Sequence, residues 1–97
     1  MTQPQHLAAL ERANEIRLAR ADVKRRVNRG EITVIDALTL DVCARMPLGE
    51  LLTAQMRWGP RRTGRLLHVV GLSELKPVGS LTERQRGLLA GQLGGAA

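Results

Sequence analysis

The most informative stretch of the sequence is Arg57–Arg65, "RWGPRRTGR", which joins two predicted helices. Gly59 followed by Pro60 is typical of a helix start, because glycine serves as an N-cap and proline is preferred at the first helical position. Three arginines follow in the first turns, at the positive end of the helix dipole, where each cation costs roughly 0.3–1 kcal/mol. The pattern predicts a helix from Pro60 whose arginines are balanced by an anion.

The same turn is the main candidate binding site. A glycine turn that leads into a helix presents unpaired backbone N–H groups to an anion such as phosphate. The predicted site consists of the turn backbone, one hydroxyl and four guanidinium groups: Gly59, Pro60, Thr63, Arg57, Arg61, Arg62 and Arg65. The alternative is an ordinary helix corner with solvated arginines, and the clustering of cations favours anion binding. Trp58 either stacks on a base or sugar or packs against the preceding helix, and we favour packing.

Apolar residues recur with a period near 3.6 along the chain, which predicts an all-α protein of about five helices. The first, long helix is expected from about Pro4 to Arg29, with Gly30 after its C-cap, and the others at about 33–44, 47–56, 60–70 and 82–93. Thr33 with Asp36, and Thr82 with Gln85, are capping-box-like starts; Gly71 ends the fourth helix, and the tail from Gly94 should fray. The residues expected to face the core are Ala9, Ile16, Val23, Val27, Ile35, Leu38, Val42, Leu48, Leu51, Leu52, Met56, Leu66, Leu67, Val69, Val70, Leu88, Leu89 and Leu93.

Length and composition indicate one small globular domain. The chain has 97 residues, 43% of them apolar, with no apolar run near the roughly 18 residues that a membrane span needs. Residues 1–6 resemble neither a signal peptide nor an anchor, so we expect a cytoplasmic protein without membrane contact. The single cysteine, Cys43, excludes an internal disulfide, and no Cys/His spacing resembles a metal site. We therefore expect no metal and no cofactor.

The charge distribution favours an acidic partner, and nucleic acid or an anionic membrane surface are the usual ones. The formal net charge is +6 and the pI about 11.3. Residues 1–30 carry seven basic against three acidic residues, residues 31–56 one against four, and residues 57–97 seven against two. In the first helix Arg17, Arg20 and Lys24 form a lane beside the apolar stripe, where they could lie along a nucleic-acid backbone.

No group of residues predicts catalysis. His6 and His68 have no Cys or Asp at nucleophile or ligand spacing. Glu11 and Glu15 are four residues apart on a predicted exposed helix face, which is typical of helix-stabilising ion pairs. Cys43 is interpreted as a small buried thiol. We expect a binding protein, not an enzyme.

Several segments together resemble the actinobacterial integration host factor. They are "LERANEIRLARADVKRRVNRG" (10–30), "RMPLGELL" (45–52), the Trp58-Gly59 turn and "VGLSELKPVGSLTERQRGLL" (70–89). The resemblance covers nearly the whole chain. It implies a basic N-terminal helix over residues 1–30 attached to a helix-two-turn-helix module over residues 31–97, within one compact domain. It also implies a monomeric nucleoid-associated protein that binds duplex DNA with little sequence preference, bends it and assists a phage integrase in recombination.

The resemblance assigns roles residue by residue. Arg17, Arg20 and Lys24 match basic positions of the family's first helix, Gly59 its turn glycine, and Arg62 a basic position in the next helix. A second contact surface would include Lys76 of the connector and Arg86 of the last helix. The chain departs from the family at Trp58, where a smaller aliphatic residue is usual, at Pro60, which replaces a lysine, and in an arginine-poor connector around Lys76. These departures predict that DNA binding depends more on the glycine turn than on the second contact surface. A divergent paralogue or a phage-encoded version of the family would fit them.

Two other function classes remain open from sequence. An RNA-binding or ribosome-associated module could use the same glycine turn, because the turn suits any phosphate backbone. A membrane-surface or partner-docking role for the basic first helix is disfavoured by its lack of bulky interfacial aromatic residues.

Overall fold

The computed structural model describes residues 3–94, with side chains described for residues 7–93. Within this range the chain is all-helical, as expected, and its one isolated β-bridge joins Pro47 to Pro77. The elements are α1 (Gln3–Asn28), α2 (Val34–Ala37), the 3-10 helix η1 (Asp41–Cys43), α3 (Leu48–Thr53), α4 (Pro60–Val70), the 3-10 helix η2 (Val78–Ser80) and α5 (Glu83–Gly94). No helix in the described part of the chain is long and apolar enough to cross a membrane.

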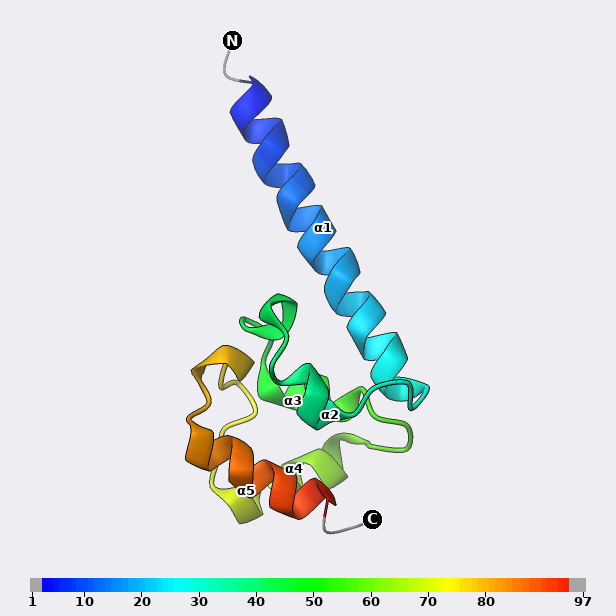
Figure 1. Cartoon of the computed structure of the whole chain (residues 1–97), viewed down its shortest axis with the longest axis vertical. Coiled ribbons are helices and arrows are strands. Elements are labelled where there is room, and N and C mark those ends of the chain that lie inside the picture. The colour runs from blue at the N-terminus through cyan, green and yellow to red at the C-terminus, as the bar shows by residue number, and fades with distance from the viewer. Residues whose placement is uncertain (1–2, 95–97) are drawn as a thin grey trace.

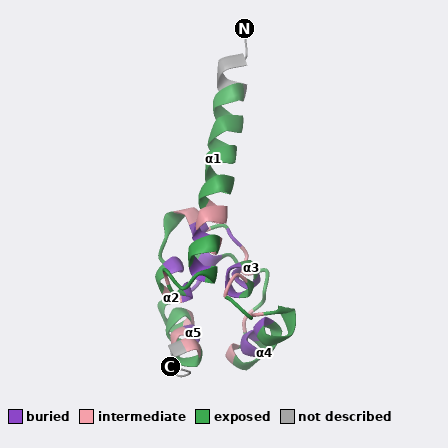
Figure 2. Cartoon of the chain, turned by 90° about the vertical axis from the view of Figure 1, so that its right-hand side faces the viewer, coloured by how far each residue is buried: buried purple, intermediate pink, exposed green. Residues whose placement is uncertain are grey.

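The molecule measures 55 × 26 × 21 Å along its principal axes, and helix α1 projects from the rest of it (Figure 1). It ends as expected before Gly30, whose φ of 77° is left-handed. Only its C-terminal end enters the core, at Val23 and Val27, whereas residues 7–19 are all exposed (Figure 2). We call residues 7–19 the arm. The expected burial of Ala9 and Ile16 is therefore wrong, because helical periodicity assumes a partner along the whole helix.

The predicted continuous helix over 33–44 is broken in the structure. Its start is confirmed: the Thr33 hydroxyl accepts a hydrogen bond from the Asp36 N–H at 3.1 Å. The helix ends at Ala37, where the Thr39 hydroxyl donates to the Asp36 carbonyl at 2.8 Å and competes with helix continuation. The chain resumes as η1, and this break lets Cys43 reach the core with 0% exposure.

The core is formed by the C-terminal end of α1 together with α2, η1, α3, α4, η2 and α5. Leu48, Leu51 and Leu52 are 0% exposed, as expected, but Met56 is 60% exposed because α3 ends at Thr53. The buried apolar residues are Val23, Val27, Val34, Ala37, Leu38, Cys43, Met46, Leu48, Leu51, Leu52, Leu66, Leu67, Val78, Leu81 and Leu89. Ile35, Val42, Val70 and Leu93 pack against this core while half-buried.

Two segments far apart in sequence, 44–49 and 74–79, lie side by side and fix the connector against α3. The Leu48 N–H donates to the Lys76 carbonyl at 2.9 Å, and the Gly79 N–H to the Ala44 carbonyl at 2.7 Å. A Cβ at Gly79 would lie 2.8 Å from the Ala44 Cβ, closer than real contacts allow. Glycine at position 79 therefore permits the close approach of the two segments.

Helices α4 and α5 begin and end as predicted. Gly59 is the N-cap of α4, Pro60 its first residue, and Gly71 ends it with a φ of 72°. In α5, Thr82 and Gln85 form a reciprocal capping box: the Thr82 N–H donates to Gln85 Oε1 at 2.9 Å, and the Gln85 N–H to the Thr82 hydroxyl at 3.1 Å.

Two side chains of these helices differ from the expected inward orientation. Val69 is 65% exposed and Leu88 is 45% exposed, whereas Leu66, Leu67 and Leu89 are buried. Gly94 is the last helical residue, and the rest of the tail that was expected to fray lies outside the described residues.

Candidate nucleic-acid interface

The start of α4 presents free backbone donors beside exposed arginines. Gly59 caps the helix without a side-chain hydrogen bond, and Pro60 has no N–H. Among the described residues, the Arg61 and Arg62 N–H groups have no backbone partner, while the Thr63 N–H closes the first turn onto the Gly59 carbonyl at 3.1 Å. Free N–H groups at the positive end of a helix dipole favour an anion.

Four arginines surround this turn: Arg57, Arg61, Arg62 and Arg65, all of them exposed. Arg57 has a φ of 66°, in the left-handed region that glycine and asparagine usually occupy. A non-glycine residue in that conformation is strained by roughly 1–2 kcal/mol. The turn therefore carries a cationic side chain at a position where glycine would be less strained.

Trp58 packs on the protein rather than projecting as a stacking platform. Its side chain is half-buried against the core, and the Arg62 guanidinium carbon lies 4.1 Å from the centroid of its ring. The favoured interpretation of Trp58 as a packing residue agrees with this arrangement. A cation–π contact of this kind contributes about 0.5–1 kcal/mol at an exposed site and holds the turn against α4. Trp58, Arg62 and Arg65 line a hollow of about 590 Å³ that reaches Leu93 of α5.

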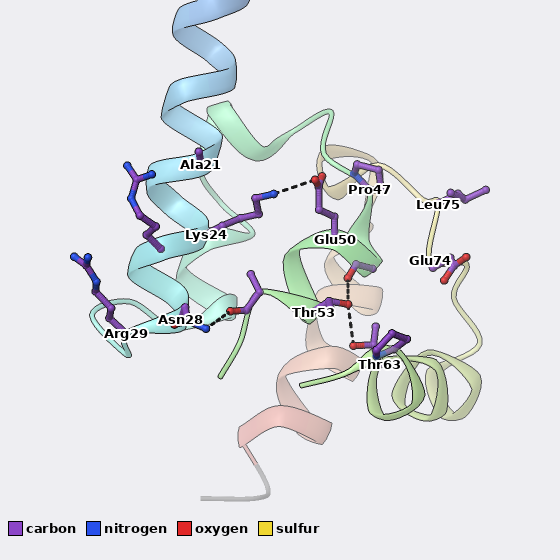
Figure 3. A pocket seen from close by; sticks show the side chains of 14 residues that line it. Ala21, Lys24, Asn28, Arg29, Pro47, Glu50, Thr53, Thr63, Glu74 and Leu75 are labelled. Atoms are coloured by element: carbon purple, nitrogen blue, oxygen red, sulfur yellow. Dashed lines mark hydrogen bonds and ion pairs between the residues drawn. The ribbon is translucent and has the colours of Figure 1, made fainter. Parts of the chain in front are cut away.

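Thr63 differs from its expected role as a hydroxyl donor to phosphate. The residue is 3% exposed, and its hydroxyl lies 3.2 Å from the hydroxyl of Thr53, which in turn donates to the Gly49 carbonyl (Figure 3). Thr63 therefore joins α4 to α3. Its spacing of three and four residues from the buried Leu66 and Leu67 was the sequence signal for an inward position.

The lane on α1 is present, and one arginine from elsewhere joins it. Arg17, Arg20 and Lys24 line one hollow of about 430 Å³ together with Arg45, which follows η1. Sequence reasoning missed Arg45 because only the fold brings it beside α1. Arg20 is partly engaged, since its Nε donates to the Val42 carbonyl at 3.2 Å.

Lys24 and Asn28 tie α1 to α3 across a larger groove (Figure 3). Lys24 Nζ lies 3.1 Å from Glu50 Oε1, and Asn28 Nδ2 donates to the Ala54 carbonyl at 3.3 Å. Both side chains of the Lys24–Glu50 pair are more than one-third exposed, so we expect the pair to contribute only about 0–1 kcal/mol to the free energy of unfolding.

This groove, of about 920 Å³, has two chemically different walls. One helical face of α1 and the residue after it supply the first wall: Ala21, Lys24, Arg25, Asn28 and Arg29. The other wall carries Glu50 of α3 and Glu74 and Leu75 of the connector, together with Pro47 and Pro60. The carboxylates of the second wall therefore separate the basic lane of α1 from the arginines at the start of α4.

The predicted second contact surface is spread over the connector and α5. Lys76 is half-buried, and its carbonyl accepts the hydrogen bond from Leu48. Arg86 is exposed, but its Nη1 donates to the Leu81 carbonyl at 3.2 Å. The fold therefore fixes the backbone of Lys76 and the guanidinium of Arg86, and both residues are separate in sequence from the arginines at the start of α4.

The residues interpreted as non-catalytic come from three different helices, and the side chain of His6 lies outside the described residues. His68 is exposed on the last turn of α4. Cys43 is buried as expected; burial raises the pKa of its thiol, and the nearby Arg20 guanidinium opposes this shift. Glu11 and Glu15 form no ion pair with any described residue; the ion pairs within α1 join Asp22 to Arg25 and Arg26 instead.

Comparison with solved structures finds a similar chain, described as sIHF, an integration host factor, bound to an 8 bp palindromic DNA. The two chains share 26% sequence identity with a TM-score of 0.78. The similarity covers 84% of this chain and 97% of that chain. The sequence matches no protein-family model, and a search of curated proteins finds no match. The all-helical arrangement is thus that of an integration host factor structure.

Proposed function

We propose that this chain binds duplex DNA through its phosphate backbone, with low sequence specificity, and bends it. The observation that carries the proposal is the similarity over 84% of the chain to an integration host factor bound to DNA. The net charge of +6 and the arginine-rich start of α4 support it independently, because a polyanion would balance both.

Low specificity follows from the kind of donor at the site. Backbone N–H groups and guanidinium groups at a helix start bind phosphate oxygens, and phosphate contacts carry no sequence information. Trp58, the one aromatic residue of the chain, is half-buried with Arg62 over its ring. Without free aromatic rings the surface is poorly suited to stacking single-stranded bases, which favours a duplex.

Bending follows from the separation of two basic surfaces by an acidic wall. The start of α4 and the lane on α1 lie on different elements, with Glu74 in the groove between them and Glu50 lining both that groove and the hollow of the lane. A duplex can touch both surfaces only if they share one face of the molecule or if the duplex curves between them, and we propose that it curves. Curving a site by 40–90° costs about 1–6 kcal/mol, which contacts at the second surface would offset.

The finer parts of the proposal extend the resemblance to the actinobacterial integration host factor. We propose that the protein is a DNA-architectural protein of the nucleoid and not an enzyme. In this role it would assist a phage integrase by holding DNA in a bent form.

The test is a set of fluorescence anisotropy titrations with several duplexes of unrelated sequence, followed by competition with duplex RNA. We expect the DNA duplexes to bind with similar Kd values and duplex RNA to compete weakly. Arg61→Ala should weaken binding, whereas Arg12→Ala, which removes an exposed arginine from the arm, serves as the matched control. Preferential binding of RNA would replace the proposal with the RNA-binding alternative, and one strongly preferred DNA sequence would contradict the backbone mechanism.

A further inference from the structure

Arg62 differs from the other arginines of the α4 turn because its guanidinium lies over an aromatic ring. The guanidinium carbon is 4.1 Å from the centroid of the Trp58 ring. At this distance the cation is attracted by the quadrupole of the ring. Trp58 is the one aromatic residue of the chain, and Arg62 is the described cation that lies over it. Within the turn, this contact gives one arginine side chain a defined position.

The Trp58 ring itself is held by the fold. Its side chain packs half-buried against the core, and its backbone N–H donates to the Gln55 carbonyl at 3.1 Å. The side-chain amide of Gln55 donates in turn to the carbonyl of Leu52 at 2.9 Å. Because Leu52 is 0% exposed, these contacts connect the ring to the core. A guanidinium stacked on this ring therefore rests on a part of the molecule that the core keeps in place.

The stacking also keeps the Arg62 guanidinium near the start of α4. Trp58 comes directly before the N-cap Gly59, whereas Arg62 is the third residue of the helix. Side chains on a helix point back toward its N-terminus, so Arg62 can reach the ring in an ordinary helical conformation. The guanidinium thus stays at the helix end where the backbone N–H groups of Arg61 and Arg62 have no backbone partner among the described residues.

Stacking leaves the hydrogen-bond donors of Arg62 available. A guanidinium contacts a ring through its flat face, while its five N–H groups point outward in its plane. Among the described residues, no hydrogen bond or ion pair uses the Arg62 side chain. Arg20 and Arg86, by contrast, are held by carbonyl groups at 3.2 Å and use one N–H group each for that contact. A ring therefore fixes an arginine without using any of the donors that a phosphate needs.

The hollow beside Trp58 is favourable for an anion. Arg62 and Arg65 both line this space of about 590 Å³, and they are neighbours on α4 because they are three residues apart. The exposed Gln92 lines it from α5, which packs beside α4 (Figure 1). No acidic residue is among the described residues that line this hollow, whereas Glu50 lines both the groove and the hollow of the α1 lane. A phosphate would therefore meet two guanidinium groups and no lining carboxylate.

We propose that Trp58 is a positioning residue, which holds the Arg62 guanidinium in place so that Arg62 and Arg65 bind one phosphodiester of the DNA backbone at the hollow. This inference rests on the proposed DNA binding and deepens it, because it gives an uncharged residue a role in binding a polyanion. The physical basis is preorganisation. A free arginine side chain loses rotamer freedom when it binds phosphate, whereas a stacked one has lost part of that freedom before the DNA arrives.

Removal of the ring should weaken DNA binding by a measurable factor. Trp58→Leu keeps an apolar side chain against the core but removes the ring face. We expect its Kd for a duplex to rise about three- to tenfold, the effect of immobilising one long side chain on binding. Arg62→Ala should raise the Kd by at least the same factor. Because the ring acts through Arg62, the double variant should bind within about twofold of Arg62→Ala alone.

The salt dependence gives a readout that a packing role would not change. Each neutralised phosphate contributes about 0.9 to the log–log slope of the association constant against salt concentration. Trp58 carries no charge, so its replacement makes this slope shallower only if Arg62 loses its phosphate contact. We expect Trp58→Leu to reduce the slope by up to about 0.9. Trp58→Phe, which restores a ring face, should bring Kd and slope back toward those of the wild type.

The test is fluorescence anisotropy of a labelled duplex with the full-length chain at several salt concentrations. It compares the wild type with Trp58→Leu, Trp58→Phe, Arg62→Ala and the double variant of Trp58→Leu with Arg62→Ala. Ile35→Ala is the matched control, because Ile35 also packs half-buried against the core but lies on α2. It should keep the Kd and the slope of the wild type. Circular dichroism checks that each variant is folded at the temperature of the titrations.

A second measurement leaves Trp58 in place. Trp58 is the one tryptophan of the chain, so the tryptophan emission of the protein reports on this ring alone. Saturation with duplex should change the emission of the wild type, because a phosphate that binds Arg62 changes the charge next to the ring. The change should be at least halved in Arg62→Ala, and an equal change in both proteins would contradict the inference.

The outcomes distinguish failure of this inference from failure of the proposed function. A wild-type chain without salt-dependent duplex binding would overturn both. If the wild type binds but Trp58→Leu keeps its Kd and slope, the positioning role is overturned. Tighter binding by Trp58→Leu would overturn it as well, since the ring would then hold Arg62 away from the phosphate. Additive losses in the double variant would show that the ring acts independently of Arg62, which also contradicts the inference.

Discussion

Replacing Gly59 with valine tests whether phosphate binds to the backbone N–H groups of the turn or only to the positive charge of its arginines. Gly59 has φ −90° and ψ 177°, a conformation that valine adopts readily, and a Cβ built there meets no atom within 4 Å. Valine is a poorer N-cap than glycine by roughly 0.5–1 kcal/mol, and the lower entropy of its unfolded chain offsets about the same amount. The free energy of unfolding should therefore change little.

DNA affinity should change far more, because the valine side chain fills the open space through which a phosphate reaches the α4 N–H groups. Loss of one charge-assisted hydrogen bond is worth about 2 kcal/mol, or roughly 30-fold in Kd. Arg62→Ala removes a charge but leaves the N–H groups open, so we expect a smaller loss. These Kd values can be measured by fluorescence anisotropy, with the fold checked by circular dichroism.

Gly87→Val is the matched control, since a Cβ at Gly87 on α5 also meets no atom within 4 Å. It should bind DNA as the wild type does. If Gly59→Val also binds as the wild type does while Arg61→Ala and Arg62→Ala lose affinity, the turn is an ordinary corner and the reasoning from its backbone is refuted.

Three further predictions concern the α1 lane, the packing glycine and the buried thiol. The double variant Arg17→Ala, Arg45→Ala should keep measurable DNA affinity but reduce the bend measured by end-to-end energy transfer; an unchanged bend would mean that this surface is only solvated. Gly79→Ala should destabilise the fold by about 1–3 kcal/mol in denaturant unfolding, because its Cβ would lie 2.8 Å from a neighbouring Cβ, whereas Gly64→Ala, with open space in α4, should stabilise it by up to about 1 kcal/mol. Equal effects of the two glycine variants would contradict the close approach. Because burial raises the pKa of Cys43, the folded state keeps its proton where the unfolded chain has lost it, so the free energy of unfolding should fall as the pH rises past the pKa of a free thiol. Cys43→Ala should remove that part of the pH dependence, and an unchanged slope would show that another group causes it.

Sequence reasoning succeeded where a structural feature depends on neighbours along the chain. Pro60 after Gly59, Gly71 in the left-handed conformation, and the capping box of Thr82 and Gln85 all stand as predicted. Each is a local arrangement of a side chain or a backbone angle at a helix end, so spacing alone specifies it.

Sequence reasoning failed where the burial of a residue depends on which helices pack against each other. Ile16, Met56 and Leu88 fit the periodicity of a buried face, yet each is at least 42% exposed because no partner element covers that position. Arg45 could not be assigned to the α1 lane because the break after α2 and the pairing of segments 44–49 and 74–79 place it there. The burial of Thr63 is an exception, because it could have been predicted from sequence. Its spacing of three and four residues to Leu66 and Leu67 already indicated an inward position.

The salt dependence of DNA affinity tests the central claim most directly. If about six phosphates are neutralised by the basic surfaces, the log–log slope of the association constant against salt concentration should be near −5. Affinity for any duplex should then fall roughly a thousandfold between 50 and 200 mM salt. An affinity that hardly changes over this range would contradict binding through the phosphate backbone.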